Sequence, residues 1–314
     1  MVYALICDLP SKWEKKIVGA MNVTLLPGGV CAEISGVNLC RPLIDNVFSK
    51  IYKAWLGTGA LLIRGQCLTD KQLLTFAKQF GDLEFPPSKL LSLMNSDSSS
   101  DKIPSHINVI SNVVEDGRPI GQLGAGEASW HTDSAFVEEP PAASILYAIE
   151  IPSKGGNTTL ANMTKAWDSL DPVLRAAIRG KKAKHDYTYT SVGERRKDFP
   201  EVLDPREAPG PAHPIVRTHP DTGRESLYLG RRLNCYILGL SLNESEKLLD
   251  QLWKHAVKPE FTYEHVWQVG DVLMWDNRCT MHRREAFDKS ERRIMHRAQV
   301  KGGRPYFEVE KPEN

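Results

Sequence analysis

Two side chains that can bind a metal ion, His131 and Asp133, lie two residues apart near the middle of the chain. In an extended segment the side chains at i and i+2 point to the same side, so an imidazole and a carboxylate can reach one ion. A third ligand from a distant strand would complete the two-histidine, one-carboxylate face that leaves positions on Fe(II) open for a cosubstrate and O2. The pattern is weak by itself, because a chain with nine histidines holds about one such match by chance.

A second match to the pattern, His219-Pro-Asp221, continues into Thr-Gly, which is a turn signal. We interpret it as the tip of a hairpin rather than a metal site, and we expect His213, His219 and His296 to be hydrogen-bonded structural histidines. The better candidate for a third ligand is His282, which follows a strand-like segment and a polar turn.

The stretch 292–300 alternates like a β-strand. One of its faces holds Arg293, Met295, Arg297 and Gln299, and the other holds Ile294, His296, Ala298 and Val300. Two guanidinium groups aimed into an interior are costly unless an anion meets them, and a guanidinium fork binds a carboxylate in bidentate fashion. The alternative is an exposed edge strand with its arginines in solvent, and the pattern alone leaves both readings open.

The order and spacing of several segments resemble the taurine / 2,4-dichlorophenoxyacetate dioxygenase (TauD/TfdA) family of Fe(II)- and 2-oxoglutarate-dependent oxygenases. The segments are 130–133, 155–158, 213–219, 275–282 and the arginine-bearing stretch 292–300. The resemblance extends from about residue 21 to about residue 303, and the segments 109–117 and 275–279 are nearer to the aryloxyalkanoate branch than to the taurine branch.

The resemblance implies that His131, Asp133 and His282 bind Fe(II), with 2-oxoglutarate and O2 as cosubstrates. The implied reaction is hydroxylation of a C–H bond of a small anionic organic substrate, with release of succinate and CO2. The carboxylate of Asp133 indicates hydroxylation, because a halogenase of this type needs a small residue there. If the hydroxylated carbon bears an ether oxygen or a sulfonate, cleavage of that bond would follow.

The resemblance also assigns residues to the cosubstrate. Arg293 and Thr158 would hold the distal carboxylate of 2-oxoglutarate, and Trp275 would form a wall of the site. Arg297 matches the arginine that in relatives binds the anionic group of the prime substrate.

Further candidates for the substrate site are Glu127, Val113 and Phe136. Relatives carry an asparagine at the position of Glu127, and a carboxylate there would repel an anionic group or attract an amine. The polar insert 96–101 falls in the region of the family's substrate lid, around 86–128.

The fold class that follows is mainly β with flanking helices, and the resemblance implies a double-stranded β-helix (jelly roll). Local patterns predict strands at 61–64, 143–147, 214–217, 226–229, 266–269, 272–275 and 292–300. Strands dominate the second half without regular alternation with helices, which argues against a doubly wound sheet. Helices are predicted at 45–56, from a capping box at 69–72 to Gly81, at 171–180 and at 241–256.

Composition limits the remaining function classes. The 314 residues carry a net charge of only +1, so the chain has no overall field for nucleic acid or an anionic membrane. No apolar run reaches membrane-spanning length, and six scattered cysteines indicate reduced thiols in a cytoplasmic protein. We expect an N-terminal extension at 1–20, one oxygenase domain at 21–305 and a tail at 306–314. The resemblance implies a homo-oligomer.

Two other functions fit the same three candidate ligands. A hydrolase or lyase could use Zn2+ there without O2, and the paired arginines would then have no 2-oxoglutarate to bind. A non-catalytic relative could bind a ligand only. Oxygen uptake coupled to succinate formation separates these two from the oxygenase.

Overall fold

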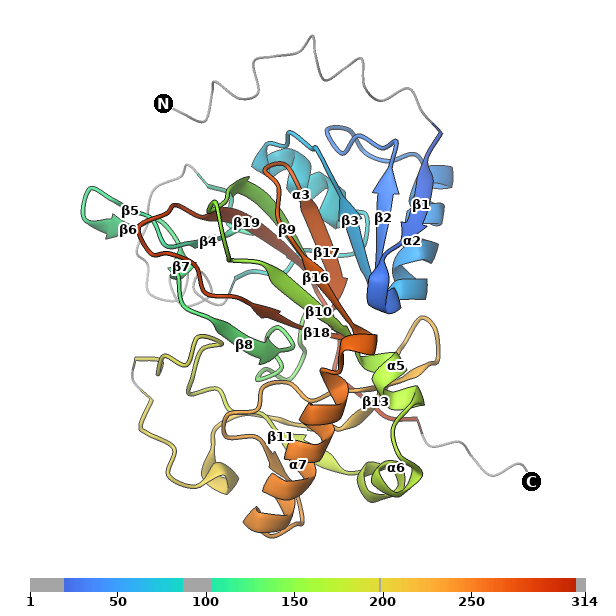
Figure 1. Ribbon diagram of the computed structural model, residues 1–314, viewed down its shortest axis with the longest axis vertical. Helices are drawn as coiled ribbons and strands as arrows, with labels where there is room; N and C mark the ends of the chain where they lie inside the picture. Colours follow the sequence, from blue (N-terminus) through green and yellow to red (C-terminus); the bar gives the residue numbers. More distant parts are fainter. Residues whose placement is uncertain (1–19, 87–102, 198, 309–314) are drawn as a thin grey trace.

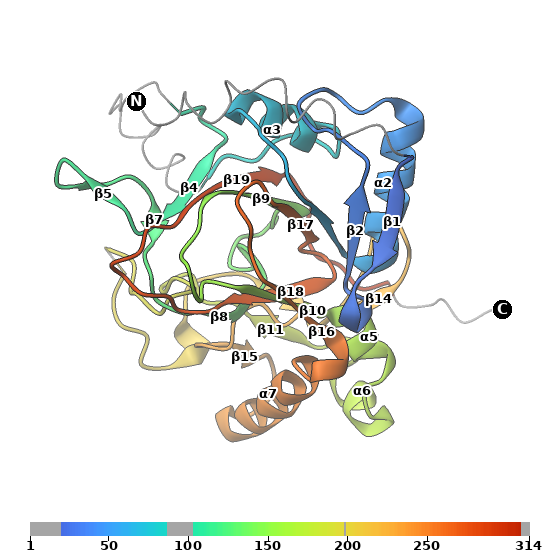
Figure 2. The same cartoon turned by 45° about the horizontal axis from the view of Figure 1, so that its top comes forward.

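Two sheets lie face to face in the computed structural model, which describes residues 20–86, 103–197 and 199–308 (Figure 1). The larger sheet contains, in spatial order, β1 (Asn22–Leu25), β2 (Cys31–Ser35), β3 (Ala60–Ile63), β17 (Val272–Asp276), β9 (Ala143–Glu150), β19 (Ile294–Val300), β4 (Asn108–Ser111) and β7 (Gln122–Leu123). The smaller sheet contains β16 (Thr262–His265), β10 (Thr158–Asn162), β18 (Thr280–Arg284) and β8 (Ala128–His131). Pairing is mainly antiparallel, and strands distant in sequence are neighbours in both sheets, as in a double-stranded β-helix (Figure 2).

Shorter ribbons extend the framework beside these sheets. They are β11 (Lys182–Lys184) with β12 (Ala212–Pro214) and β15 (Tyr236–Ile237), β13 (Val216–Thr218) with β14 (Glu225–Leu227), and β5 (Val114–Glu115) with β6 (Arg118–Pro119). The segment from His219 to Asp221 lies at the turn between β13 and β14, where the Asp221 amide donates to the His219 imidazole. The predicted hairpin tip is therefore confirmed.

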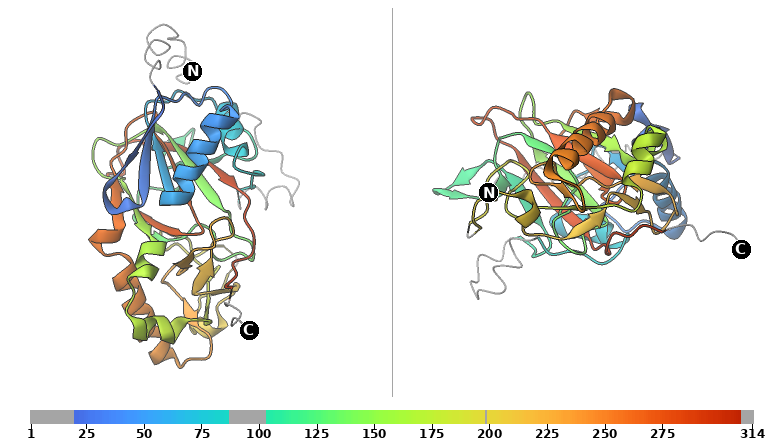
Figure 3. Two further views of the ribbon diagram at one scale, coloured as in Figure 1. Left: turned by 90° about the vertical axis from the view of Figure 1, so that its right-hand side faces the viewer. Right: turned by 90° about the horizontal axis from the view of Figure 1, so that it is seen from below.

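Helices cover the outer faces of both sheets (Figure 3). They are α2 (Asp45–Thr58), α3 (Asp70–Lys78), α5 (Met163–Asp168), α6 (Pro172–Ile178) and α7 (Leu242–Ala256), with 3₁₀ turns η2 (Pro27–Gly29), η3 (Pro205–Glu207) and η4 (Pro259–Phe261). The predicted capping box begins α3, because Thr69 Oγ1 accepts from the Gln72 amide and the Gln72 side chain accepts from the Thr69 amide. No helix in the described ranges combines the length and the apolar character that crossing a membrane requires.

Three apolar cores follow from these layers. The first lies between α2, α3 and the outer face of the larger sheet, the second lies between the two sheets, and the third lies between the smaller sheet, α5 and α7. Strand β19 contributes residues to the first two cores. Ile294, Ala298 and Val300 belong to the outer core, and Met295 belongs to the core between the sheets. The predicted two-faced strand is confirmed, and β19 is a central strand rather than an exposed edge.

The predicted strand at 266–269 is wrong, because the chain turns there instead. Strand β16 ends at His265, the Gln268 amide donates to the Asp271 carboxylate at 2.9 Å, and Gly270 adopts a φ of +87°. A Cβ on Gly270 would lie 2.6 Å from the carbonyl oxygen of Gln66, so this turn needs glycine.

The sequence predicts an N-terminal extension at 1–20 and a C-terminal tail at 306–314. The first residues of the predicted C-terminal tail are held in place, because the Thr218 amide donates to Tyr306 and the Glu308 amide donates to the Thr218 hydroxyl. The polar insert 96–101 and residues 1–19 of the predicted N-terminal extension lie outside the described residues.

Candidate active site

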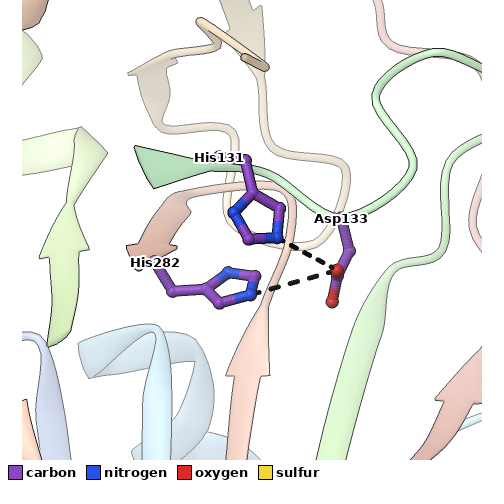
Figure 4. Close-up of side chains that lie close together, drawn as sticks. All are labelled: His131, Asp133 and His282. Atoms are coloured by element: carbon purple, nitrogen blue, oxygen red, sulfur yellow. Dashed lines mark ion pairs between the residues drawn. The ribbon is translucent and has the colours of Figure 1, made fainter. Parts of the chain in front are cut away.

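His131, Asp133 and His282 converge between the two sheets (Figure 4). His131 and His282 are direct cross-strand partners on β8 and β18, with ring centroids 4.2 Å apart, and Asp133 follows in the turn after β8. The Nε2 atoms of His131 and His282 lie 3.7 and 3.9 Å from Asp133 Oδ1, and the three ligand atoms are within 4.8 Å of one another. We call these three residues the open cluster.

Hydrogen bonds orient two members of the open cluster, His131 and Asp133. His131 Nδ1 lies 2.7 Å from the carbonyl oxygen of Ser129, which can only accept, so Nδ1 carries the proton and Nε2 keeps a lone pair. The Asp133 carboxylate accepts from the Ser144 hydroxyl at 2.6 Å and from Arg297 Nη1 at 3.1 Å.

The protonation states suit a metal ion. Burial lowers the pKa of His131 and His282, to about 3 for His282, which also lies beside the other imidazole. Burial alone would raise the pKa of Asp133, but the Arg297 guanidinium and the two imidazoles hold it well below its ordinary value. Two neutral imidazoles and one carboxylate are therefore available at neutral pH, and this donor set fits Fe(II) with positions left open.

A cavity opens beside the open cluster. Its polar lining is His131, His282, Thr158, Ser191, Arg284, Arg293 and Arg297, and its apolar lining is Ile110, Leu123, Ala128, Leu146 and Trp275. The structure thus brings the sequence-predicted Thr158, Trp275, Arg293 and Arg297 to one space with the candidate ligands. The sequence pattern does not reveal Ser191 and Arg284 as lining residues, because their positions depend on a distant loop and on strand register.

Arg293 is a buried cation that lacks an acidic partner in the described part of the chain. The residue is 1% exposed, and its Nε and Nη2 atoms have no hydrogen-bond partner among the described residues. Burial and then the charge of Arg284 lower its pKa to about 9. Gly156 makes room for the guanidinium, since a Cβ there would lie 3.3 Å from Arg293 Nε. An anion would relieve this arrangement.

Three residues predicted for the substrate site, Glu127, Val113 and Phe136, are not part of the cavity lining. The Glu127 side chain is 60% exposed and lies 4.0 Å from Arg283, so water screens its charge. Val113 packs into the core under α2 and α3. Phe136 lies below the guanidinium group of Arg196, 4.7 Å from ring centroid to Cζ, and outside the cavity lining.

A second group of ligand-type residues, His219, Asp276 and Cys279, also has its atoms within 4.8 Å. We call it the closed cluster. Asp276 accepts from Arg278 through Nε, Nη2 and the backbone amide, and from His219 Nε2 at 3.0 Å. Burial raises the pKa of the Cys279 thiol, so its sulfur stays protonated. The hydrogen-bonded histidines expected from sequence are present, with His213 on Val137 and His296 on Asp70.

Comparison with known proteins agrees with this geometry. Residues 22–299 match the model of the family described as taurine catabolism dioxygenase TauD, TfdA family. The chain is 32% identical to a (S)-phenoxypropionate/alpha-ketoglutarate-dioxygenase of Sphingobium herbicidovorans, over 90% of this chain and 96% of that protein. It is 37% identical to an alpha-ketoglutarate-dependent 2,4-dichlorophenoxyacetate dioxygenase of Cupriavidus pinatubonensis, over 85% of this chain and 93% of that protein.

Solved structures give the same result. The structure of AAD-2 in complex with Mn(II) and N-oxalylglycine superposes with a TM-score of 0.73 at 32% identity, covering 91% of this chain and 99% of that one. A structure of a putative alpha-ketoglutarate-dependent taurine dioxygenase from Burkholderia xenovorans has a TM-score of 0.73 at 31% identity, covering 92% of both chains. The chain therefore belongs to the TauD/TfdA family, on its aryloxyalkanoate side, and is an Fe(II)- and 2-oxoglutarate-dependent dioxygenase.

Proposed function

We propose that the open cluster holds the catalytic Fe(II) and that the enzyme hydroxylates a small organic acid bound beside it. The convergence of one ionised carboxylate with two neutral imidazoles, both of which line the cavity, is the observation that carries the proposal. Bound Fe(II) supplies the activation of O2 that couples decarboxylation of 2-oxoglutarate to substrate oxidation. His131, Asp133 and His282 fix the position of the ion, and Ser144 orients the carboxylate through its 2.6 Å hydrogen bond.

Arg293 and Thr158 bind the distal carboxylate of 2-oxoglutarate in this proposal. The buried guanidinium provides charge and a bidentate fork, and the Thr158 hydroxyl lies on the same cavity wall. Trp267 Nε1 donates to Thr158 Oγ1 at 3.1 Å, which leaves the hydroxyl proton of Thr158 available for the carboxylate. Trp275, whose ring centroid lies 4.5 Å from that of His282, closes the other side.

The substrate acid lies between Arg297 and the apolar wall. Arg297 Nη1 donates one hydrogen bond to Asp133, and the side chain also lines the cavity. Its guanidinium can therefore bind a carboxylate next to the metal position. Ile110, Leu123 and Leu146 suit an apolar or aromatic body. Relatives named for phenoxypropionate and 2,4-dichlorophenoxyacetate favour an aryloxyalkanoate-type acid as the substrate class.

The overall reaction consumes one O2 and one 2-oxoglutarate, and gives succinate, CO2 and a hydroxylated substrate. Where the new hydroxyl shares its carbon with an ether oxygen, the C–O bond breaks and the carbon becomes a carbonyl. The aryloxy oxygen takes the proton and leaves as the phenol. The dry apolar wall positions the C–H bond and excludes water.

A succinate assay tests the proposal. Anaerobic protein is loaded with Fe(II), given 2-oxoglutarate and O2, and offered phenoxyacetate, taurine or an alkyl sulfate. We expect succinate in amounts equal to the O2 consumed, with the fastest turnover for the aryloxy acid. Turnover with Zn2+ in the absence of O2 would instead support a hydrolase or lyase. Arg297→Met is expected to raise the KM for the acid, and Arg293→Met the KM for 2-oxoglutarate; the reverse result would exchange the two roles.

We also propose a cytoplasmic homo-oligomer that binds neither nucleic acid nor membranes. The net charge of +1 and the scattered cysteines support these expectations. Sedimentation of the purified protein tests the oligomeric state, and a monomer at micromolar concentration would contradict it.

A further inference from the structure

A third guanidinium, that of Arg284, enters the cavity from β18. Arg284 lies two residues after His282 on the same strand, and alternation along a strand places both side chains on the inner side of the sheet. The residue is only 6% exposed. No carboxylate of the described residues pairs with it, although burial of a charge without a partner is costly.

Strand register places Arg284 at the cosubstrate end of the cavity. Thr158 on β10 is the direct cross-strand partner of Arg284, whereas His282 pairs with Leu160, two residues farther along β10. Arg284 and Arg293 both lie against the ring of Phe287, with their Cζ atoms 5.7 and 5.9 Å from its centroid. Two cations and the Thr158 hydroxyl therefore surround one part of the cavity.

Backbone carbonyls hold Arg284 in this orientation. Its Nη2 atom donates to Leu123 O at 2.9 Å and to Gly126 O, in the segment just before β8. Its Nε atom is buried and has no partner among the described residues. The carbonyls orient the side chain without neutralising it, so one charge remains for a ligand.

From this juxtaposition we infer that Arg284 is a second cosubstrate-binding arginine, which joins Arg293 and Thr158 around the distal carboxylate of 2-oxoglutarate. The inference rests on the proposed function and extends it by one residue. A substrate role is disfavoured because the substrate anchor, Arg297, lies beside Asp133, while Arg284 is paired with Thr158. Two guanidinium groups on one carboxylate make the site strongly selective for 2-oxo acids that carry a distal carboxylate.

Calorimetric titration of Mn(II)-loaded protein without O2 tests this inference, since it measures binding without turnover. The ligands are 2-oxoglutarate and 2-oxopentanoate, which lacks the distal carboxylate. The measured quantity is the ratio of their dissociation constants, because a general loosening of the site changes both and leaves the ratio unaltered. We expect Arg284→Met to reduce this ratio about tenfold to hundredfold, as the loss of a charged hydrogen bond predicts.

Matched variants make the result specific. Arg284→Lys keeps the charge without the fork and is expected to give an intermediate ratio. Arg292→Met removes a neighbouring arginine whose side chain is 51% exposed and paired with Glu150, and is expected to leave the ratio unchanged. Equal Mn(II) stoichiometry and melting temperature in all variants would show that they fold.

The outcomes separate this inference from the proposed function. Wild-type protein that fails to bind 2-oxoglutarate contradicts the proposed function itself. A wild-type preference for 2-oxoglutarate that survives in Arg284→Met overturns only the inference about Arg284. A variant that keeps the preference but raises the KM for the acid substrate also overturns it, and assigns Arg284 to the substrate.

Discussion

The open cluster and the closed cluster each contain a buried carboxylate, but they differ in how that carboxylate is used. Each has a buried aspartate beside a histidine and an arginine. Each also includes the histidine of one of the two His-x-Asp matches in the sequence. Asp133 accepts two hydrogen bonds, from Ser144 and Arg297, so about half of its lone pairs stay available. Asp276 accepts four, three from Arg278 and one from His219, and has none left for an ion.

The difference shows that proximity of histidine and carboxylate does not define a metal site. What matters is unused acceptor capacity that faces a cavity. The imidazoles of the open cluster line the cavity, whereas the histidine of the closed cluster donates to its own aspartate. The first arrangement leaves acceptor atoms that could bind a ligand, and the second joins the β13–β14 hairpin to β17.

Removing one ligand from each cluster should give the largest contrast. Asp133→Ala is expected to abolish succinate formation and to weaken Fe(II) binding by more than about a hundredfold, because the ion loses its anionic ligand. His219→Ala is expected to retain one Fe(II) per chain. Equilibrium dialysis measures both, and loss of iron from His219→Ala alone would exchange the roles of the two clusters.

Breaking the closed cluster should affect stability rather than metal binding. Arg278→Met leaves Asp276 buried without its principal cation, and we expect the free energy of unfolding to fall by about 3–5 kcal/mol. Urea denaturation measures the loss. The surviving folded protein should still bind Fe(II) with the wild-type affinity, and a change smaller than about 1 kcal/mol would show that the network adds little.

The stability gap between wild type and Arg278→Met should depend on pH. Burial raises the pKa of Asp276, but Arg278 outweighs it and holds the folded pKa below the ordinary 3.8, so the wild-type contribution is complete above that pH and is lost as pH falls. Without Arg278, only His219 opposes the effect of burial on the Asp276 pKa. We therefore expect this pKa to rise above its ordinary value, so that stability is lost as pH rises. The gap should therefore widen between pH 4 and pH 7, by at most about 1.4 kcal/mol per pH unit.

Urea unfolding of both proteins at pH 4, 5.5 and 7 measures this gap. A gap that is constant with pH would mean that Asp276 does not carry the charge that Arg278 compensates.

The smallest expected effect comes from changing Ser144, whose hydroxyl orients the Asp133 carboxylate of the open cluster. Ser144→Ala removes the hydroxyl that donates to Asp133 Oδ2, and should weaken Fe(II) binding about tenfold to hundredfold without changing metal stoichiometry. Asn277 and Gln299 also donate to this hydroxyl, so a small loss of stability should accompany it. Unchanged iron affinity would mean that Arg297 alone orients the carboxylate.

Local sequence patterns predicted the elements that position the site. The capping box at Thr69 and the alternation of β19 depend only on near neighbours in sequence, so both were readable and both are confirmed. Resemblance to a family supplied the candidate ligands, which the structure brings together; their role as ligands stays a proposal.

Features that depend on strand register were not predictable, and neither was the turn at 266–269. Whether Arg284 faces the cavity depends on its pairing with Thr158, more than a hundred residues away in sequence. The apolar residues at 266–269 match a strand pattern, yet the Asp271 side chain captures the Gln268 amide and the chain turns. Glu127 lies one residue before β8 but is exposed, which its position in sequence does not reveal.

Strand β8 is at the edge of the smaller sheet, with β18 on one side. On its other side, within the described residues, it makes isolated backbone contacts with Ser191 and Arg231. It nevertheless supplies His131 and leads directly into Asp133. An ion held across β8 and β18 would tie this edge strand to its neighbour, so that metal occupancy and local order would be thermodynamically linked. Chelation should then accelerate deuterium uptake by the amides of β8 well before the molecule as a whole melts.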